Sequence, residues 1–241
     1  LSESGESGYL SHKQVGAYGI RYDKSFIVAP LKDTGGKLWS LQFIKDDGSK
    51  RFMKEGRTKG LFHLLGALES VDAAYVAEGY STAASVHEAT RKPVFCVFNC
   101  GNLLPAIKEI REAWPHLQLT IAGDDDQWTD GNPGRTRAEA AAEKHNCKTV
   151  FPEFSNATQR EHQPTDFNDL HCLQGLQAVT RQLQKAPSPK PSGKVNKKDT
   201  VPRILKTGKE GLYLDDEWVS SSIQVRAYTR DENSENWGRL V

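Results

Sequence analysis

The sequence predicts an α/β protein in which a small β-rich N-terminal lobe precedes a parallel sheet covered by helices. Two observations predict this fold. Between residues 26 and 54, three short apolar stretches are separated by turns that contain Gly and Asp, the pattern of an antiparallel sheet. From residue 71 onward, apolar runs of strand length alternate with helical stretches at a spacing of about 25 residues, which is typical of βαβ units.

The N-terminal lobe is expected to contain strands at residues 26–30, 38–44 and 51–54. Its turns, at residues 32–37 and 45–50, supply the Gly and Asp residues that tight connections favour. Strands joined by such short turns pair with their neighbours in the chain. The lobe is therefore predicted to be a small antiparallel sheet.

The second part of the chain is expected to form four parallel strands, at residues 73–77, 93–98, 117–122 and 148–151. Helices are expected at residues 81–90, 103–114, 135–146 and 169–185, with an irregular segment at 153–165. Because connections between parallel strands are right-handed, the C-terminal ends of all these strands meet at one edge of the sheet. Ligands of open α/β sheets bind at that edge.

The chain is expected to divide into four parts: a basic lobe at residues 1–70, a catalytic domain at 71–185, a linker at 186–204 and the first strands of a further domain at 205–241. The linker is assigned because the segment is rich in Pro, Ser, Gly and Lys and has no apolar periodicity. This composition predicts disorder. Beyond it, apolar residues again alternate with period two.

Charge is divided along the chain, although the 32 basic and 31 acidic side chains nearly cancel. Residues 9–70 carry 11 Lys and Arg against 6 Asp and Glu, a net charge of +5, and residues 71–184 carry 10 against 15, a net charge of −5. A basic surface beside an acidic cleft favours a polyanionic substrate. The alternative is that both sets of charges form solvated faces.

Several classes of protein are excluded or disfavoured by composition. No apolar run approaches the roughly 20 residues of a membrane helix, and no signal peptide is visible, so a cytoplasmic protein is expected. The four cysteines contain no CxxC pair, which disfavours a structural zinc site and indicates reduced thiols.

Acidic side chains follow two of the predicted parallel strands. Glu78 comes directly after residues 73–77, and Asp124, Asp125 and Asp126 follow residues 117–122 after one glycine. Carboxylates gathered at one edge repel one another unless a cation is present, and hard oxygen ligands suit Mg²⁺ or Mn²⁺. In Asp-x-Asp the first and third side chains can share a face while Asp125 points elsewhere.

Two further polar segments follow strands. Asp166, after the fourth strand, is a third possible contributor to the metal site. Asn102, between the second strand and a helix, can meet a phosphate or merely cap a turn. Acidic loops before helices also act as N-caps, so the triplet alone does not establish a metal site.

The motifs Val76-Ala-Glu-Gly-Tyr-Ser-Thr-Ala-Ala-Ser85, Ile121-Ala-Gly-Asp-Asp-Asp126 and Gly134-Arg-Thr-Arg-Ala-Glu-Ala-Ala-Ala142 resemble the Toprim domain. The order of motifs is more specifically similar to primases of phages, plasmids and mobile elements. Residues 9–68 resemble the basic lobe that precedes Toprim in those primases, and Asp166-Phe-Asn-Asp169 is similar to the closing motif of the family. The resemblance implies a Toprim-type, Rossmann-like sheet of four parallel strands.

The resemblance also implies a function: RNA primer synthesis from NTPs on single-stranded DNA, for replication of a phage or mobile element. Glu78, Asp124 and Asp126 would be catalytic. Asp124 and Asp126, with Asp166, would hold Mg²⁺ or Mn²⁺, and Glu78 would act as a further metal ligand or as a general base. Residues expected to contact nucleotides or nucleic acid are Arg51, Lys54, Lys59 and Asn102. For the three cations, an exposed hairpin edge kept soluble by charge is the alternative.

The neighbouring parts of such primases give further expectations. Residues 218–241 resemble the opening of the helicase-like domain found downstream in primase-helicases, so a helicase domain in the same parent chain is an expected partner. The zinc-binding module that usually precedes the catalytic core, and the ATPase motor that follows it, are not among these 241 residues.

Two other functions share the same acidic residues. Topoisomerases and Toprim nucleases cleave strands with this constellation, although none of the seven tyrosines is placed as a topoisomerase nucleophile and the basic lobe favours synthesis. The region could also be a non-catalytic nucleic-acid docking module of a helicase.

Overall fold

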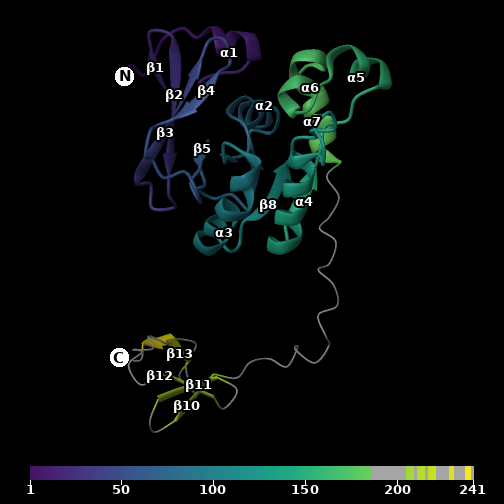
Figure 1. The fold of residues 1–241 in the computed structure, drawn as a ribbon. Helices are drawn as coiled ribbons and strands as arrows, with labels where there is room; N and C mark the ends of the chain where they lie inside the picture. The colour runs from purple at the N-terminus through teal and green to yellow at the C-terminus, as the bar shows by residue number, and fades with distance from the viewer. Residues whose placement is uncertain (186–204, 209–210, 215–216, 221–227, 231–236, 240–241) are drawn as a thin grey trace. The chain divides into compact units, whose positions relative to one another are not determined.

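The computed structural model describes residues 1–185 and five short segments beyond them, at residues 205–208, 211–214, 217–220, 228–230 and 237–239 (Figure 1). The chain divides into two compact units, Leu1–Ser192 and Gly193–Val241. The predicted linker at 186–204 lies outside the described residues. The division of the chain into four domains stays a prediction.

The N-terminal lobe begins with helix α1 (Gly8–Lys13), followed by a four-stranded antiparallel sheet. The strands pair in chain order: β1 (Arg21–Asp23), β2 (Phe26–Lys32), β3 (Leu38–Lys45) and β4 (Lys50–Phe52). The three predicted strands are confirmed, and β1 adds a short edge strand that pairs with β2.

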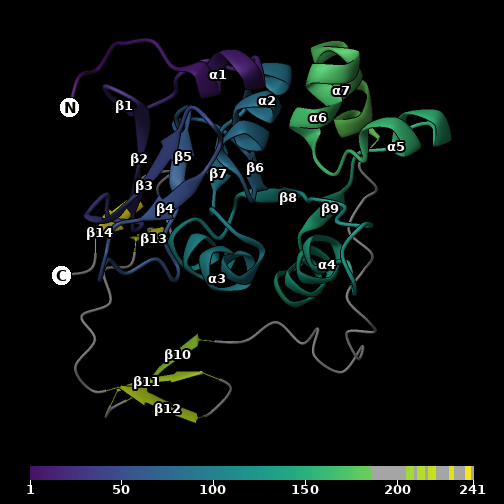
Figure 2. The same ribbon diagram turned by 45° about the horizontal axis from the view of Figure 1, so that its top comes forward.

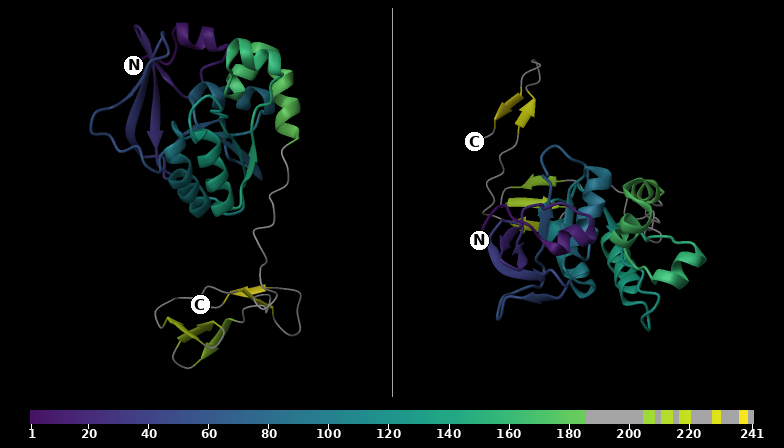
Figure 3. Two further views of the ribbon diagram at one scale, coloured as in Figure 1. Left: turned by 45° about the vertical axis from the view of Figure 1, so that its right-hand side comes forward. Right: turned by 90° about the horizontal axis from the view of Figure 1, so that it is seen from above.

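Strand β3 shows why this sheet has one covered face and one open face. Ser40, Gln42 and Ile44 are buried, whereas the alternate residues Trp39 and Phe43 are only partly buried. Since side chains of a strand alternate between faces, the first set packs toward the rest of the molecule and the second forms the outer face. Figure 3 shows this sheet as a separate layer beside the helices of the second part.

The central sheet has five strands in the order β5-β7-β6-β8-β9 (Figure 2). They are β5 (His63–Leu65), β6 (Ala73–Ala77), β7 (Val94–Cys96), β8 (Gln118–Ala122) and β9 (Lys148–Val150). The four predicted parallel strands are confirmed. The sheet is mixed, however, because β5 pairs antiparallel with β7, and a strand of only three residues leaves little periodic signal.

Helices cover both faces of this sheet (Figure 2). One face carries α2 (Tyr80–Thr90), α6 (Phe167–Gln174) and α7 (Leu176–Gln184), and the other carries α3 (Leu103–Ala113) and α4 (Pro133–His145). The prediction of one helix at 169–185 is wrong, because Gly175 adopts φ of +80° and separates α6 from α7. The segment 153–165, predicted to be irregular, contains helix α5 (Asn156–His162).

Two hydrophobic cores lie on the two faces of the sheet. One joins β2 and β3 to α2, α6 and α7, and its largest side chains include Ile27, Tyr80 and Phe167. The other packs α3 and α4 on the sheet through residues such as Phe95 and Ile107. Because the first core is shared between the N-terminal lobe and the central sheet, it fixes the lobe beside the C-terminal edge of the parallel strands.

Beyond residue 204 the structure describes two small antiparallel sheets: β10 (Leu205–Gly208), β11 (Gly211–Leu214) and β12 (Glu217–Ser220) in one, and β13 (Tyr228–Arg230) and β14 (Trp237–Arg239) in the other. The strands predicted at 211–214 and 217–219 are confirmed. Most of the alternating stretch at 222–229 lies outside the described residues. Among the helices that the structure describes, none is long and apolar enough to cross a membrane.

Candidate active site

Glu78 lies at the C-terminal end of the central strand β6. Ala77, the last residue of β6, pairs with Ala122, the last residue of β8, so both strands end at the same level. Glu78 is the first residue after β6, and Asp124 follows β8 after one glycine. Glu78 is 7% exposed, and its Oε1 atom is buried without a hydrogen-bond partner among the residues that the structure describes. The predicted meeting of the two acidic segments is therefore confirmed.

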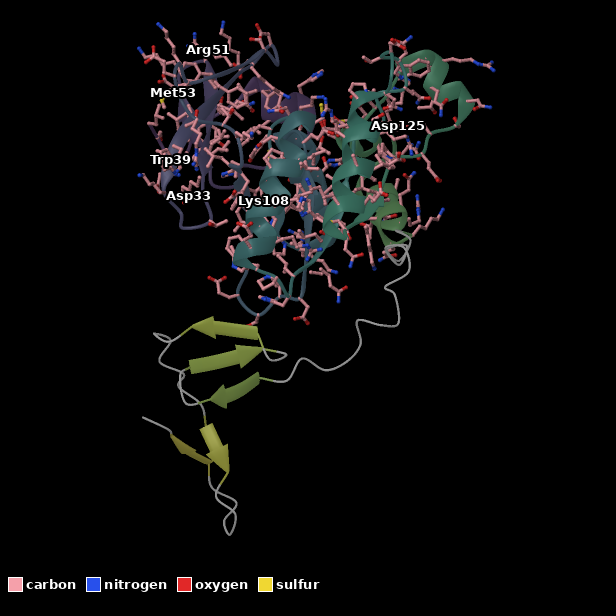
Figure 4. The ribbon with its side chains drawn as sticks, turned by 60° about the horizontal axis from the view of Figure 1, so that its bottom comes forward. Asp33, Trp39, Arg51, Met53, Lys108 and Asp125 are labelled. Carbon is pink, nitrogen blue, oxygen red and sulfur yellow. The ribbon has the colours of Figure 1, made fainter. Side chains whose placement is uncertain are left out.

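The three aspartates after β8 have different surroundings. The Asp125 carboxylate accepts two hydrogen bonds of 2.9 Å from Arg135 and one of 2.6 Å from Asn132. Asp126 Oδ2 accepts a 2.9 Å hydrogen bond from the backbone N–H of Gly134, while Asp124 Oδ1 is buried and has no hydrogen-bond partner in the described part of the chain. Asp125, labelled in Figure 4, thus forms an ion pair with Arg135, whereas Asp124 and Asp126 do not. The prediction that Asp125 points elsewhere is confirmed.

Asp166 reaches the same edge from a third segment. It is the N-cap of α6, where its Oδ1 accepts from the N–H of Asp169 at 2.8 Å and the Asp169 carboxylate accepts in return from the backbone N–H of Asp166. This capping box starts the helix. The carbonyl of Thr165 accepts a 2.7 Å hydrogen bond from the N–H of Asp125, which fixes the cap beside the aspartate triplet.

Burial and mutual repulsion raise the pKa values of these carboxyl groups. Burial raises the pKa of Glu78 to about 7, with Asp126 and Asp166 contributing, while the backbone N–H of Asp124 opposes the rise. Burial also raises the pKa of Asp124 well above its usual value, helped by Asp166 and Glu78. The pKa of Asp166 is raised by burial and by Asp169. Glu78, Asp124 and Asp166 are therefore stabilised in their protonated forms unless positive charge is supplied.

The donor atoms suit a hard divalent cation. Glu78 and Asp124 each have a carboxylate oxygen without a hydrogen bond, and the carboxylates of the site raise one another's pKa values. They form a set of oxygen donors without a compensating positive charge. Neither Glu78 nor Asp124 forms an ion pair with Lys or Arg in the described part of the chain. The oxygen donors therefore fit Mg²⁺ or Mn²⁺ in kind. Across the same residues, however, no three His, Cys, Asp or Glu side chains are close enough together to form a metal site.

Two lysines of the N-terminal lobe face the acidic residues, and neither is among the cations predicted from the sequence. Lys50 lowers the pKa of Asp124, and Lys13 lowers that of Asp166 and lies 4.0 Å from Asp169. Strand alternation was the available signal for Lys50, because Lys50 pairs with the buried Ile44 of β3. Arg51, the next residue of β4, must then lie on the opposite face of the sheet.

The three cations proposed from the sequence are spread over the lobe rather than gathered at the acids. Arg51 is on the outer face of the sheet, with its guanidinium 5.4 Å from the ring of Phe43. The Lys54 side chain is 93% exposed and pairs with Glu55 at 3.8 Å. Lys59 is exposed and lines a groove beside α3. In Figure 4 Arg51 lies at the edge of the lobe, far from Lys108 on α3.

Asn102 is buried, and its side chain holds main-chain groups. Its Oδ1 accepts from the N–H of Gly60 at 2.7 Å, and its Nδ2 donates to the carbonyls of Leu61 and Val97 at 2.9 Å each. These bonds occupy the amide, so its position favours a structural role over contact with a phosphate. The helix cap considered as the alternative is not formed by this side chain either.

Close packing at Gly134 brings the start of α4 against the aspartates, and this predicts an effect on stability. A Cβ atom there would lie 2.7 Å from the carbonyl oxygen of Asp124 and 2.8 Å from Asp126 Oδ2. We therefore expect Gly134→Ala to lower the free energy of unfolding by about 1–3 kcal/mol, as overpacking does. Urea denaturation followed by helical circular dichroism measures it.

Gly79→Ala is the matched control. Like Gly134 in α4, Gly79 lies at the start of a helix at this site, as the N-cap of α2, but its added Cβ would meet only Thr82 Oγ1, at 3.6 Å. We expect a loss of less than about 1 kcal/mol there. Equal losses in the two variants would contradict the close approach at Gly134.

The mostly parallel sheet, with Glu78, Asp124 and Asp126 at its C-terminal edge, defines a class of α/β protein that carries acidic residues at the ends of its parallel strands. Residues 73–177 match the family model of the Toprim domain, in agreement with the motifs of the sequence. The chain is 41% identical over 145 residues to a DNA primase TraC of Escherichia coli, which covers 56% of this chain and 14% of that protein. A second DNA primase TraC of Escherichia coli is 40% identical over 161 residues, covering 62% of this chain and 11% of the relative. The chain thus spans only a small part of the curated relatives it matches.

Solved structures agree with the fold. The primase fragment of the bacteriophage T7 primase-helicase is similar with a TM-score of 0.54 and 16% identity, covering 74% of each chain. A T7 structure described as containing primase domains bound to an RNA/DNA hybrid and dTTP matches with a TM-score of 0.57 and 15% identity, over 77% of this chain and 94% of that one. At such identities these matches concern the fold alone.

Proposed function

We propose that this chain is the catalytic core of a DNA primase, which synthesises RNA primers on a single-stranded DNA template. The observation that carries the proposal is the meeting of Glu78, Asp124 and Asp126 at the paired ends of β6 and β8, beside a basic lobe. The similarity to DNA primase TraC supports primer synthesis over the other activities of Toprim domains.

The proposed reaction is nucleotidyl transfer. The 3′-oxygen of one nucleotide forms a bond to the α-phosphorus of an incoming NTP, the bond to the bridging oxygen breaks, and pyrophosphate leaves with the electron pair. Glu78, Asp124 and Asp126, with Asp166, would hold Mg²⁺ or Mn²⁺. When bound, such an ion lowers the pKa of the attacking hydroxyl and neutralises charge on the phosphoryl oxygens.

The other residues of the site position these acids and balance their charge. Arg135 and Asn132 hold the Asp125 carboxylate and so fix the loop that carries its two neighbours. Lys50 and Lys13 bring positive charge from the lobe to the acidic edge, where they can meet the triphosphate of an NTP. A polyanion can then enter a site that otherwise repels it.

The comparisons also suggest partners. A T7 relative in fold is named a primase-helicase, and we propose that a helicase domain follows this core in the parent chain. A role in replicating a mobile element, with a cytoplasmic location, is part of the same proposal.

Incubating the 241-residue chain with NTPs, Mg²⁺ and either single-stranded or supercoiled DNA tests the proposal. We expect dinucleotides and short RNA products that require the single strand and the divalent ion. Nicking of the supercoiled DNA without RNA products would favour a nuclease. DNA binding that is independent of metal, with neither product, would favour a docking module; both outcomes would overturn the primase assignment.

A further inference from the structure

The outer face of the N-terminal sheet carries a patch of apolar side chains, most of which lie outside both hydrophobic cores. Val28 of β2 pairs with Phe43 of β3 and is only 1% exposed, yet it belongs to neither core. The rings of Phe43 and Phe26 meet edge to face, with their centres 5.6 Å apart. We call the following residues the outer patch: Phe26, Val28, Trp39, Leu41, Phe43 and Met53.

Part of the outer patch is open to solvent. Met53 is 38% exposed, and Leu38, the residue before Trp39, is 53% exposed. Figure 4 shows Arg51, Met53 and Trp39 in one row along the edge of the lobe. Large apolar side chains that are exposed together on one face of a sheet are typical of an interaction surface.

Cations lie against the aromatic rings of the outer patch. Lys37 Nζ and the guanidinium of Arg57 are 4.1 and 4.2 Å from the ring centre of Trp39, and the guanidinium of Arg51 is 5.4 Å from that of Phe43. The rings help to hold these cations in place. None of the three cations forms an ion pair with an acid in the part of the chain that the structure describes.

The acidic residues of this face lie at its two ends. Asp23 pairs with Phe26 at the start of β2, and Asp33 follows the end of β2. The Asp33 carboxylate accepts a 2.7 Å hydrogen bond from Trp39 Nε1 and bonds of 3.0 Å from two backbone N–H groups. Strands β2, β3 and β4 themselves contain no Asp or Glu. The middle of the face is therefore apolar and positively charged.

The positions of the cations favour an acidic protein over a nucleic acid as the ligand of this face. Single-stranded nucleic acids use aromatic side chains on a sheet by stacking their bases on the rings. Here Lys37 and Arg57 already lie over the ring of Trp39, so a base would have to displace them. Carboxylates, in contrast, can accept hydrogen bonds from the stacked cations without moving them. Trp, Arg and Met are also enriched at protein interfaces.

We infer that the outer patch binds an acidic segment of a partner protein that carries large apolar side chains. Its carboxylates pair with Lys37 and Arg51, and its apolar side chains cover Leu38 and Met53. Arg51 and Lys50 lie on opposite faces of the sheet, so a partner bound here leaves the acidic edge of the central sheet open. The partner can therefore hold the protein while the catalytic edge is in use. Binding at this face requires neither NTP nor template, so it is independent of the proposed function.

Fluorescence anisotropy tests the inference with the 241-residue chain and a short labelled peptide in which Asp and Glu alternate with Leu and Phe. We expect the parent chain to bind this peptide, and to bind it less tightly at high salt, because exposed charges are screened. Lys37→Glu combined with Arg51→Glu should weaken binding roughly tenfold or more, since two attractive charges become repulsive. Leu38→Ala combined with Met53→Ala should weaken it by removing apolar contacts while leaving the charge unchanged.

Each double variant has a matched control away from the lobe. Lys92→Glu with Lys185→Glu makes the same change in charge at two exposed positions, and Leu173→Ala shortens an exposed leucine of α6. We expect both controls to bind the peptide as the parent does, and a peptide with Asn and Gln in place of the acids to bind weakly. Helical circular dichroism checks that each variant is folded.

Three results would overturn the inference. The first is a parent chain that does not bind the acidic peptide, or binds it no better than its Asn and Gln counterpart. The second is a loss of affinity for a labelled single-stranded DNA oligonucleotide, but not for the peptide, in the two lobe variants, which would assign the face to nucleic acid. The third is a parent dimer in sedimentation that Leu38→Ala with Met53→Ala dissociates, which would assign the face to a second copy of the chain.

Discussion

Replacing Asp124 with Asn is expected to reduce dinucleotide synthesis at least roughly a hundredfold, the scale on which a group that stabilises the transition state is lost. The substitution keeps the size of the side chain and removes one negative charge from the proposed metal site. Unfolding will not explain the loss: burial raises the pKa of Asp124, so its ionised form is disfavoured in the fold and a neutral amide relieves that cost. Initial rates at saturating NTP and Mg²⁺ measure the effect.

Asp125→Asn is the sharpest control, because it makes the same chemical change one residue away. Asp125 is bound to Arg135 and Asn132 and takes no part in the proposed metal site. Weakening its partly exposed ion pair should cost about 1 kcal/mol of stability and loosen the loop, but the folded variant keeps the charges of Asp124 and Asp126 and should lose far less activity than Asp124→Asn. If Asp125→Asn lost as much activity as Asp124→Asn while remaining folded, the assignment of alternate faces would be wrong.

Local pattern was enough to predict the elements that build the site. Apolar runs of strand length marked β6 and β8, and parallel pairing then required Glu78 and Asp124 to meet, because the strands of such a sheet end on one edge. The orientation of Asp125 followed from the alternation of successive side chains. These features depend on neighbours in sequence or on the handedness of one connection.

Features that depend on distant residues were not predictable in this way. Strand β5 exists because β7 offers it an edge, and its three residues carry too little pattern to show this. The buried amide of Asn102 satisfies main-chain groups around residues 60 and 97, so its role is visible only after the chain has folded. Lys50 is different, because its pairing with the buried Ile44 places it on the inner face of the sheet, whereas the predicted cation Arg51 pairs with Phe43 on the outer face.

Removing the charge of Glu78 is expected to stabilise the metal-free protein at alkaline pH. Burial, with Asp126 and Asp166, raises the pKa of Glu78 from 4.5 to about 7, and a shift of that size corresponds to about 3 kcal/mol. The native state binds the proton more tightly than the unfolded state, so stability falls as pH rises from about 4.5 through 7 and stays low above it. Asp124 adds to this trend, and Lys50 opposes it.

We therefore expect Glu78→Gln in EDTA to raise the free energy of unfolding by up to about 3 kcal/mol at pH 8 and by much less at pH 5. Mg²⁺ should stabilise the parent chain more at pH 8 than at pH 5, because a divalent ion binds ionised carboxylates and favours the folded state. That response should shrink in Glu78→Gln, which lacks one donor charge. Urea denaturation followed by helical circular dichroism measures these differences, since every described helix lies in residues 1–185.

Glu143→Gln, at an exposed position of α4, is the control for removing a glutamate charge as such, and its stability should follow that of the parent at both pH values. Equal stabilisation of the parent and Glu78→Gln by Mg²⁺ would place the ion away from Glu78. A Glu78→Gln variant that is no more stable than the parent at pH 8 would show that the carboxylates at the ends of β6 and β8 do not repel one another. The uncompensated negative charge that points to a divalent cation at this edge of the sheet would then be absent.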